Sequence, residues 1–124
     1  MGNHNEEFKK IFYSEAQDQY EQLNKHFTIL EKDTTNRNAV EVVFRITHTL
    51  KANAASMGYN GISEMAHILE DIFSLINTGK ITLNTDLFNT LFRANDKIGD
   101  LIASIKTEEK ISYKGLLTKL KDNT

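Results

Sequence analysis

Apolar residues recur every three or four positions along most of this chain, and short polar stretches separate the runs. The first such stripe begins at Phe8 and ends at Leu30, and others follow it toward the end of the chain. This spacing is typical of helices that bury one face. The pattern predicts helices at about residues 5–32, 37–57, 62–78, 85–106 and 113–121.

The ends of these runs carry residues that commonly begin or stop a helix. We expect Asn3 or Asn5 to cap the first helix, and Asn84 or Thr85 to cap the fourth. Gly58 follows the second run, where a left-handed residue often ends a helix. The chain has no proline to interrupt a helix from within. Four long amphipathic helices joined by short links predict an all-α fold, an antiparallel four-helix bundle with an additional C-terminal fifth helix.

The composition limits the domain count and the classes of partner. The length of 124 residues suits one core, so we expect a single domain over residues 1–124. The absence of cysteine excludes disulfides, thiolate catalysis and thiolate metal sites. A net charge of −2, with lysines spread along the chain, argues against nucleic acid as a partner. No run reaches the roughly 20 apolar residues that cross a bilayer, so we expect a cytoplasmic, monomeric domain without membrane insertion.

His48 lies on the polar side of the second predicted helix. At about 100° per residue, the apolar residues of this helix fall opposite the histidine. They are Ala39, Val42, Val43, Ile46, Leu50, Ala54 and Met57. Lys51 lies one turn further on, and the small side chains of Ala52 and Ala55 leave space beside the ring. An exposed imidazole in this setting is a candidate for group transfer.

Glu70, on the third predicted helix, is expected to lie level with His48. If the second and third helices form an antiparallel hairpin, residues equally far from the turn face each other. With the centre of the turn near residue 59, His48 lies eleven residues before it and Glu70 eleven residues after it. His67, three residues before Glu70, shares the polar side of the same helix. The carboxylate and the imidazole should therefore meet.

A carboxylate beside an imidazole has a definite chemical use. By accepting a hydrogen bond from Nδ1–H, Glu70 would fix the tautomer of His48 and leave Nε2 free as the nucleophile. The same carboxylate would offset the positive charge that appears when Nε2 attacks an electrophile. Lys51 would meet an anion carried on Nε2 as a mobile point charge. These residues predict a nucleophilic histidine with an orienting acid.

The residues around His48 resemble the motif of the histidine phosphotransfer (HPt) family. The matching stretch is FRITHTLK at residues 44–51, followed by the small residues of ANAASMG at residues 52–58. The run HILED at residues 67–71 is similar to the His-x-x-Glu of the form found at the N-terminus of CheA-type chemotaxis kinases. Five helices in about this length also fit the family, so the resemblance covers essentially the whole chain.

The resemblance implies a function, partners and residue roles. A histidine kinase ATP-binding domain would phosphorylate His48, which would donate the phosphoryl group to an aspartate of a response regulator receiver domain. Glu70 would orient His48, Lys51 would be the phosphate neighbour and His67 a supporting polar neighbour. ATP and Mg²⁺ would belong to the partner domains, because nothing here resembles a Gly-rich phosphate loop. The domain itself would need no cofactor and would act as a carrier without an ATP site of its own, within a CheA-type kinase.

The chain departs from the family directly after the lysine, where glycine is usual. Ala52 and then Asn53 follow Lys51 here, which narrows the clearance beside His48 by a methyl group. Alanine is still small, so phosphotransfer should survive the change. The geometry of docking is the property that this departure affects.

Three other interpretations use the same residues. Two of them are a stand-alone HPt relay protein and a non-catalytic helical docking module in which His48 is incidental. The third is a metal site made of His48, His67 and Glu70. Di-iron bundles need several inward carboxylates with Glu-x-x-His on two helices, so we expect no metal site. The remaining histidines, His4 and His26, are interpreted as solvated side chains.

Overall fold

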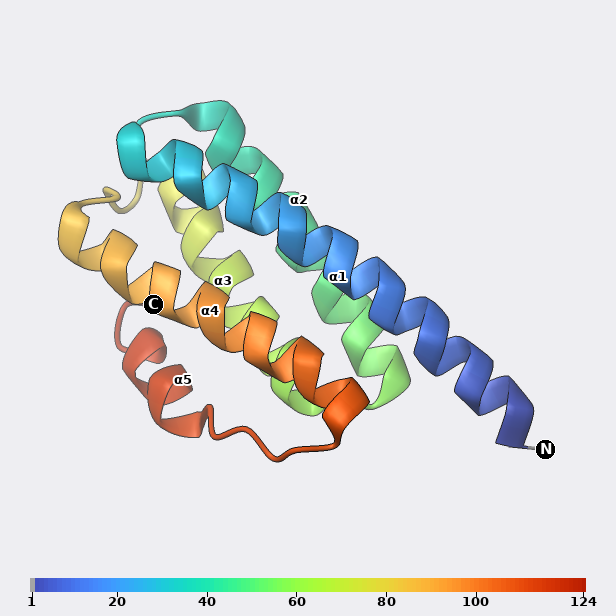
Figure 1. Cartoon of the computed structure of the whole chain (residues 1–124). Helices are drawn as coiled ribbons and strands as arrows, with labels where there is room; N and C mark the ends of the chain where they lie inside the picture. The colour runs from blue at the N-terminus through green and yellow to red at the C-terminus, as the bar shows by residue number, and fades with distance from the viewer. Residues whose placement is uncertain (1) are drawn as a thin grey trace.

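The computed structural model describes the backbone of residues 2–124 and the side chains of residues 5–124. This part of the chain forms five α-helices and no strand: α1 (Gly2–Lys32), α2 (Arg37–Met57), α3 (Asn60–Asn77), α4 (Thr85–Thr107) and α5 (Lys114–Lys121). Helices α1 to α4 form a bundle, and the short α5 packs beside α3 and α4 (Figure 1). The predicted all-α fold is confirmed. Among the described residues, no helix has the length and hydropathy needed to span a bilayer.

The helix bounds differ from the predicted ones mainly at the starts of α1 and α3. Since α1 begins at Gly2, Asn3 and Asn5 lie within the helix and neither is its N-cap. This end of α1 extends past the rest of the bundle (Figure 1). Water can satisfy the first backbone N–H groups there, so no capping side chain is required. α3 begins at Asn60 rather than at residue 62, with Tyr59 at the N-cap position.

Asparagine side chains cap α2 and α4. Oδ1 of Asn36 accepts a hydrogen bond of 2.9 Å from the backbone N–H of Ala39. Oδ1 of Asn84 accepts one of 2.8 Å from the N–H of Leu87, which confirms Asn84 as the cap of the fourth helix. These bonds satisfy N–H groups that have no partner within the helix, and so define where each helix begins.

The turn between α2 and α3 sets the register of the two helices. Gly58 ends α2 in the left-handed conformation, with φ of 80°, as its position predicts. Its N–H donates to the carbonyl oxygen of Ala55, and the N–H of Tyr59 donates to that of Ala54. α3 begins at the next residue, Asn60, and runs back along α2. The short connection leaves the two helices little freedom to slide.

The buried face of α2 is turned toward Thr47 relative to the predicted face. The buried residues are Ala39, Val40, Val43, Thr47, Leu50 and Ala54. Val42 and Ile46 are only half-buried. Thr47 tolerates burial because its hydroxyl lies 2.9 Å from the carbonyl oxygens of both Val43 and Phe44, to which it can donate. A polar residue thus occupies a core position that the apolar pattern alone does not reveal.

His26 is buried, which corrects its interpretation as a solvated side chain. Only 9% of the residue is exposed, and its Nδ1 lies 2.8 Å from the carbonyl oxygen of Gln22, one turn earlier in α1. Because a carbonyl oxygen only accepts hydrogen bonds, Nδ1 carries the proton in this contact. The ring is satisfied within its own helix, as a histidine with a packing role would be.

Candidate functional site

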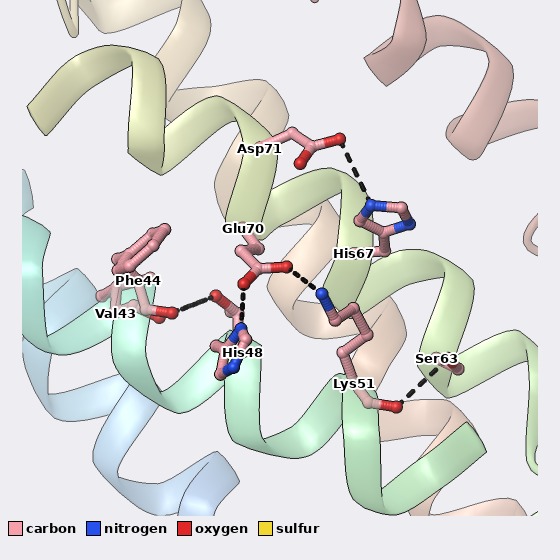
Figure 2. Close-up of polar contacts among 9 residues, drawn as sticks. Val43, Phe44, His48, Lys51, Ser63, His67, Glu70 and Asp71 are labelled. Carbon is pink, nitrogen blue, oxygen red and sulfur yellow. Dashed lines mark hydrogen bonds and ion pairs between the residues drawn. The ribbon is translucent and has the colours of Figure 1, made fainter. Parts of the chain in front are cut away.

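His48 of α2 and Glu70 of α3 face each other across the helix hairpin (Figure 2). Nδ1 of His48 donates a hydrogen bond to Oε2 of Glu70. The side chain of His48 is 62% exposed, whereas that of Glu70 is only 9% exposed. The structure therefore brings the two groups together, as the position of the turn predicts. With Nδ1 engaged, Nε2 keeps its lone pair and is the ring atom available to a partner.

Lys51 contacts the other oxygen of the same carboxylate. Its Nζ donates a hydrogen bond of 2.6 Å to Oε1 of Glu70, and its side chain is 28% exposed. Both oxygens of Glu70 are therefore engaged by donors from α2 (Figure 2). From the sequence, Lys51 is expected to act on a group carried by His48. In the structure, its ammonium group lies against the acid.

The carboxyl group of Glu70 is held in its charged form. Burial by itself would raise its pKa, but the hydrogen bonds from Lys51 and His48 and the positive charge of Lys51 outweigh that effect. The pKa of Glu70 consequently lies below its ordinary value. A carboxylate that stays ionised can accept the Nδ1 hydrogen bond and offset positive charge on the imidazole.

A third cross-helix hydrogen bond supports the arrangement further along the hairpin. Oγ of Ser63 in α3 donates to the backbone carbonyl oxygen of Lys51 in α2, over 3.2 Å (Figure 2). It ties the backbone of α2 to α3 close to the acid and so helps to fix their register. Sequence reasoning did not single out Ser63, because a serine near the start of a helix usually serves as a cap.

His67 lies on the same helix as Glu70, but its ion-pair partner is Asp71. Nε2 of His67 is 3.6 Å from Oδ2 of Asp71, one turn along α3, and the two side chains are 59% and 50% exposed. Figure 2 shows His67 turned toward Asp71, while Glu70 is turned toward His48 and Lys51. Asp71 had no predicted role, although its spacing of four residues from His67 is a signal for such a contact.

On the side of His48 toward the C-terminus of α2, the surface carries small exposed residues. Thr49, Ala52 and Ala55 are all exposed, and the two alanines follow His48 by about one and two turns of α2. Their short side chains leave room for another protein to approach Nε2. The site therefore combines a free imidazole nitrogen, an ionised acid that steadies the ring, and an open surface, which together suit a nucleophile that reacts with groups held by other proteins.

Comparison with known proteins gives both a family and close relatives. A family model described as Hpt domain matches residues 7–108. Chemotaxis protein CheA of Treponema pallidum is 38% identical over 100 residues, which make up 81% of this chain and 12% of the relative. CheA of Borreliella burgdorferi is 36% identical over 99 residues, or 80% of this chain and 12% of the relative. The chain thus corresponds to a small part of each of these proteins.

Solved structures share the fold. The solution structure of the histidine phosphotransfer domain of CheA has a TM-score of 0.83 and 26% sequence identity, with 94% of this chain and 91% of that chain covered. The phosphorylated P1 domain of CheA3 from R. sphaeroides, in complex with CheY6, has a TM-score of 0.81 and 18% identity, with 94% of each chain covered. Since the family model spans most of the bundle, including both His48 and Glu70, this chain belongs to the Hpt domain family.

Proposed function

We propose that this chain is a phosphoryl carrier in two-component signalling, with His48 as the phosphoacceptor. The observation that carries the proposal is the pairing of an exposed imidazole with a nearly buried carboxylate in an Hpt domain. Nε2 of His48 accepts a phosphoryl group from ATP bound to the catalytic domain of a histidine kinase. It then donates the group to an aspartate of a response regulator receiver domain.

Each transfer is a substitution at phosphorus. The lone pair of Nε2 forms a bond to the γ-phosphorus of ATP, and the bond from that phosphorus to the bridging oxygen breaks to release ADP. The positive charge that develops on the ring is offset by Glu70 through the Nδ1 hydrogen bond. In the second step a carboxylate oxygen of the receiver attacks the same phosphorus. The nitrogen–phosphorus bond then returns its electron pair to Nε2 of His48.

Lys51 has two tasks in this proposal. Its hydrogen bond to Oε1 keeps the carboxylate of Glu70 in place for His48. Its positive charge, one turn away from His48, also attracts the anionic phosphoryl group, because a lysine side chain is a mobile point charge. His67 is a supporting polar neighbour at the margin of the site, where it pairs with Asp71.

We also propose that the chain is part of a CheA-type chemotaxis kinase. The match to 12% of the length of CheA relatives supports this, because the remainder of such a protein can supply the domain that binds ATP and Mg²⁺. That catalytic domain and a receiver domain are the proposed partners, and the cytoplasm, which holds ATP, is the proposed location. A stand-alone relay protein would use the same residues in the same way.

The fifth helix belongs to the same proposed domain. It lies beyond the residues matched by the family model. Leu117 and Leu120 of α5 are nonetheless buried against the bundle, with 6% and 0% of each residue exposed. Burying two leucines contributes roughly 1.5–3 kcal/mol each. This supports one Hpt domain over residues 1–124.

Labelling of a His48→Gln variant tests the phosphoacceptor. The chain is incubated with Mg·ATP and the ATP-binding domain of a CheA-type kinase, and phosphohistidine is then detected. The wild-type chain should be labelled, and the label should leave it when a receiver domain is added. His48→Gln should remain unlabelled while its circular dichroism stays helical, because the side chain is largely in solvent.

Thr49→Gln is the matched control, since it places the same amide side chain on the neighbouring exposed residue. It should be labelled normally. Normal labelling of His48→Gln would overturn the proposal. A wild-type chain that stays unlabelled while still binding the kinase or receiver domain would favour a docking module instead.

A further inference from the structure

Three possible metal ligands lie together on α3, where His67 and Asp71 are exposed and Glu70 is buried. A nitrogen of His67 and carboxylate oxygens of Glu70 and Asp71 all lie within 4.8 Å of one another. The trio differs from the one considered from the sequence, His48, His67 and Glu70, for which no metal site is expected. In the structure His48 is engaged with Glu70, and Asp71 completes the group from one turn along the same helix.

The donor types fit a cation of the zinc class, and one pair of donors has nearly the spacing that such an ion requires. Zn²⁺ binds imidazole nitrogen and carboxylate oxygen at about 2.1 Å, so two ligands in tetrahedral geometry lie about 3.4 Å apart. Nε2 of His67 and Oδ2 of Asp71 are 3.6 Å apart, already close to that separation. Both side chains are at least half exposed, so a hydrated ion can reach them from solvent. Three protein ligands would leave one position for water.

We propose that His67, Glu70 and Asp71 bind a divalent transition-metal cation such as Zn²⁺, and that the bound ion slows phosphorylation of His48. The second half rests on the proposed function. The slower phosphorylation follows from the double role of Glu70, whose two oxygens are engaged by His48 and Lys51. A cation that takes Oε1 displaces the ammonium group of Lys51 and draws negative charge away from the imidazole. Glu70 then offsets the charge on the phosphorylated ring less well.

Lys51 is the partner that gives way. Its ammonium group ends a flexible stem that is 28% exposed, so it can move into water, where it is strongly hydrated. Its present contact is with Oε1 of Glu70, so a cation that binds this oxygen has to displace the ammonium group. We therefore expect two substitutions to change the affinity for the metal ion in opposite directions. Removing the carboxylate of Asp71 weakens metal binding, and removing the charge of Lys51 strengthens it.

Isothermal titration of the whole chain with ZnCl₂ tests the site without any phosphotransfer. Loss of a ligand in Asp71→Asn should weaken Zn²⁺ binding by about tenfold or more. Lys51→Met should bind Zn²⁺ several-fold more tightly than the wild type, and His48→Gln should bind it about as tightly. Equal affinities for the wild type and Asp71→Asn would overturn the proposal, as would loss of binding in His48→Gln.

Labelling by the kinase domain with and without Zn²⁺ tests the regulatory half. Zn²⁺ should slow labelling of the wild type severalfold more than labelling of Asp71→Asn under the same conditions, and a chelator selective for Zn²⁺ over Mg²⁺ should restore the rate. Equal slowing of both would place the effect on the kinase and contradict the inference. If His48 is never labelled, the proposed function fails, whereas the titration still decides whether the metal site exists.

Discussion

The His48–Glu70 and His67–Asp71 pairs bring an imidazole and a carboxylate together in two different ways. The first pair joins α2 to α3 and has an acid that is 9% exposed, whereas the second lies within α3 and has an acid that is 50% exposed. Exposed pairs four residues apart in a helix contribute only about 0.2–0.5 kcal/mol and are easily exchanged for water. The buried acid has few other partners, so it holds its imidazole in one orientation.

The pairs also differ in the nitrogen that is engaged. Glu70 accepts a hydrogen bond from Nδ1 of His48, and Nε2, the outer ring atom, has no hydrogen-bond partner among residues 5–124. Asp71 lies against Nε2 of His67. Glu70 is in addition held by Lys51, whereas Asp71 has no second cation among the ion pairs of the described residues. From this difference we expect that only a histidine whose acid is fixed in place acts as a nucleophile, and that proximity to a carboxylate alone is not sufficient.

The largest difference between the two pairs should appear in the rate of His48 phosphorylation when each acid is removed in turn. Glu70→Ala should slow phosphorylation of His48 by about 10-fold to 100-fold, because the ring loses the group that fixes its tautomer and orientation. Asp71→Asn, assayed with Mg·ATP in buffer free of Zn²⁺ and other transition metals, should be phosphorylated at the wild-type rate. Initial rates of labelling by the same kinase domain provide the measurement.

Circular dichroism of both variants provides the control, since each must remain helical for the rates to be compared. An unchanged rate in Glu70→Ala would remove the orienting role of Glu70. A similar loss in both variants would mean that the two pairs are not functionally distinct.

Removing the charge of Lys51 should have an intermediate effect. Lys51→Met takes away one of the two hydrogen bonds to Glu70, and a bond to a charged group is worth roughly 1.5 kcal/mol or more. We expect phosphorylation to slow by about tenfold, and the pKa of Glu70 to rise toward its ordinary value. Carbon-detected NMR titration of the Glu70 carboxyl group measures the second effect. A pKa that stays low in Lys51→Met would show that Lys51 does not hold the acid.

The smallest expected effect is on the pH dependence of stability. Because the pKa of Glu70 is lowered in the folded state, its contribution is present above the ordinary value for glutamate, about 4.3, and is lost as pH falls through the folded value. The wild type should therefore lose more free energy of unfolding between about pH 6 and about pH 3 than Glu70→Gln. Urea denaturation at several pH values measures the difference, and parallel curves for the two proteins would contradict it.

Much of this arrangement could be predicted from the sequence. Periodicity located the helices, and the position of Gly58 was enough to bring Glu70 level with His48, because a short antiparallel hairpin has one register. The burial of Thr47 and His26 could not be predicted, since each depends on a hydrogen bond to its own helix that satisfies a polar group in the interior. The contact of Lys51 with Glu70 was also missed, because a long side chain can reach several partners.

The position of the phosphoryl group on the labelled chain tests the central claim most directly. Two-dimensional ³¹P and ¹⁵N NMR of the chain, phosphorylated by the kinase domain, identifies both the histidine and the ring nitrogen that is modified. The expected result is one phosphohistidine, at Nε2 of His48, with Nδ1 still protonated and hydrogen-bonded. Phosphorylation at Nδ1 of His48, or on His67, would contradict the role assigned to Glu70.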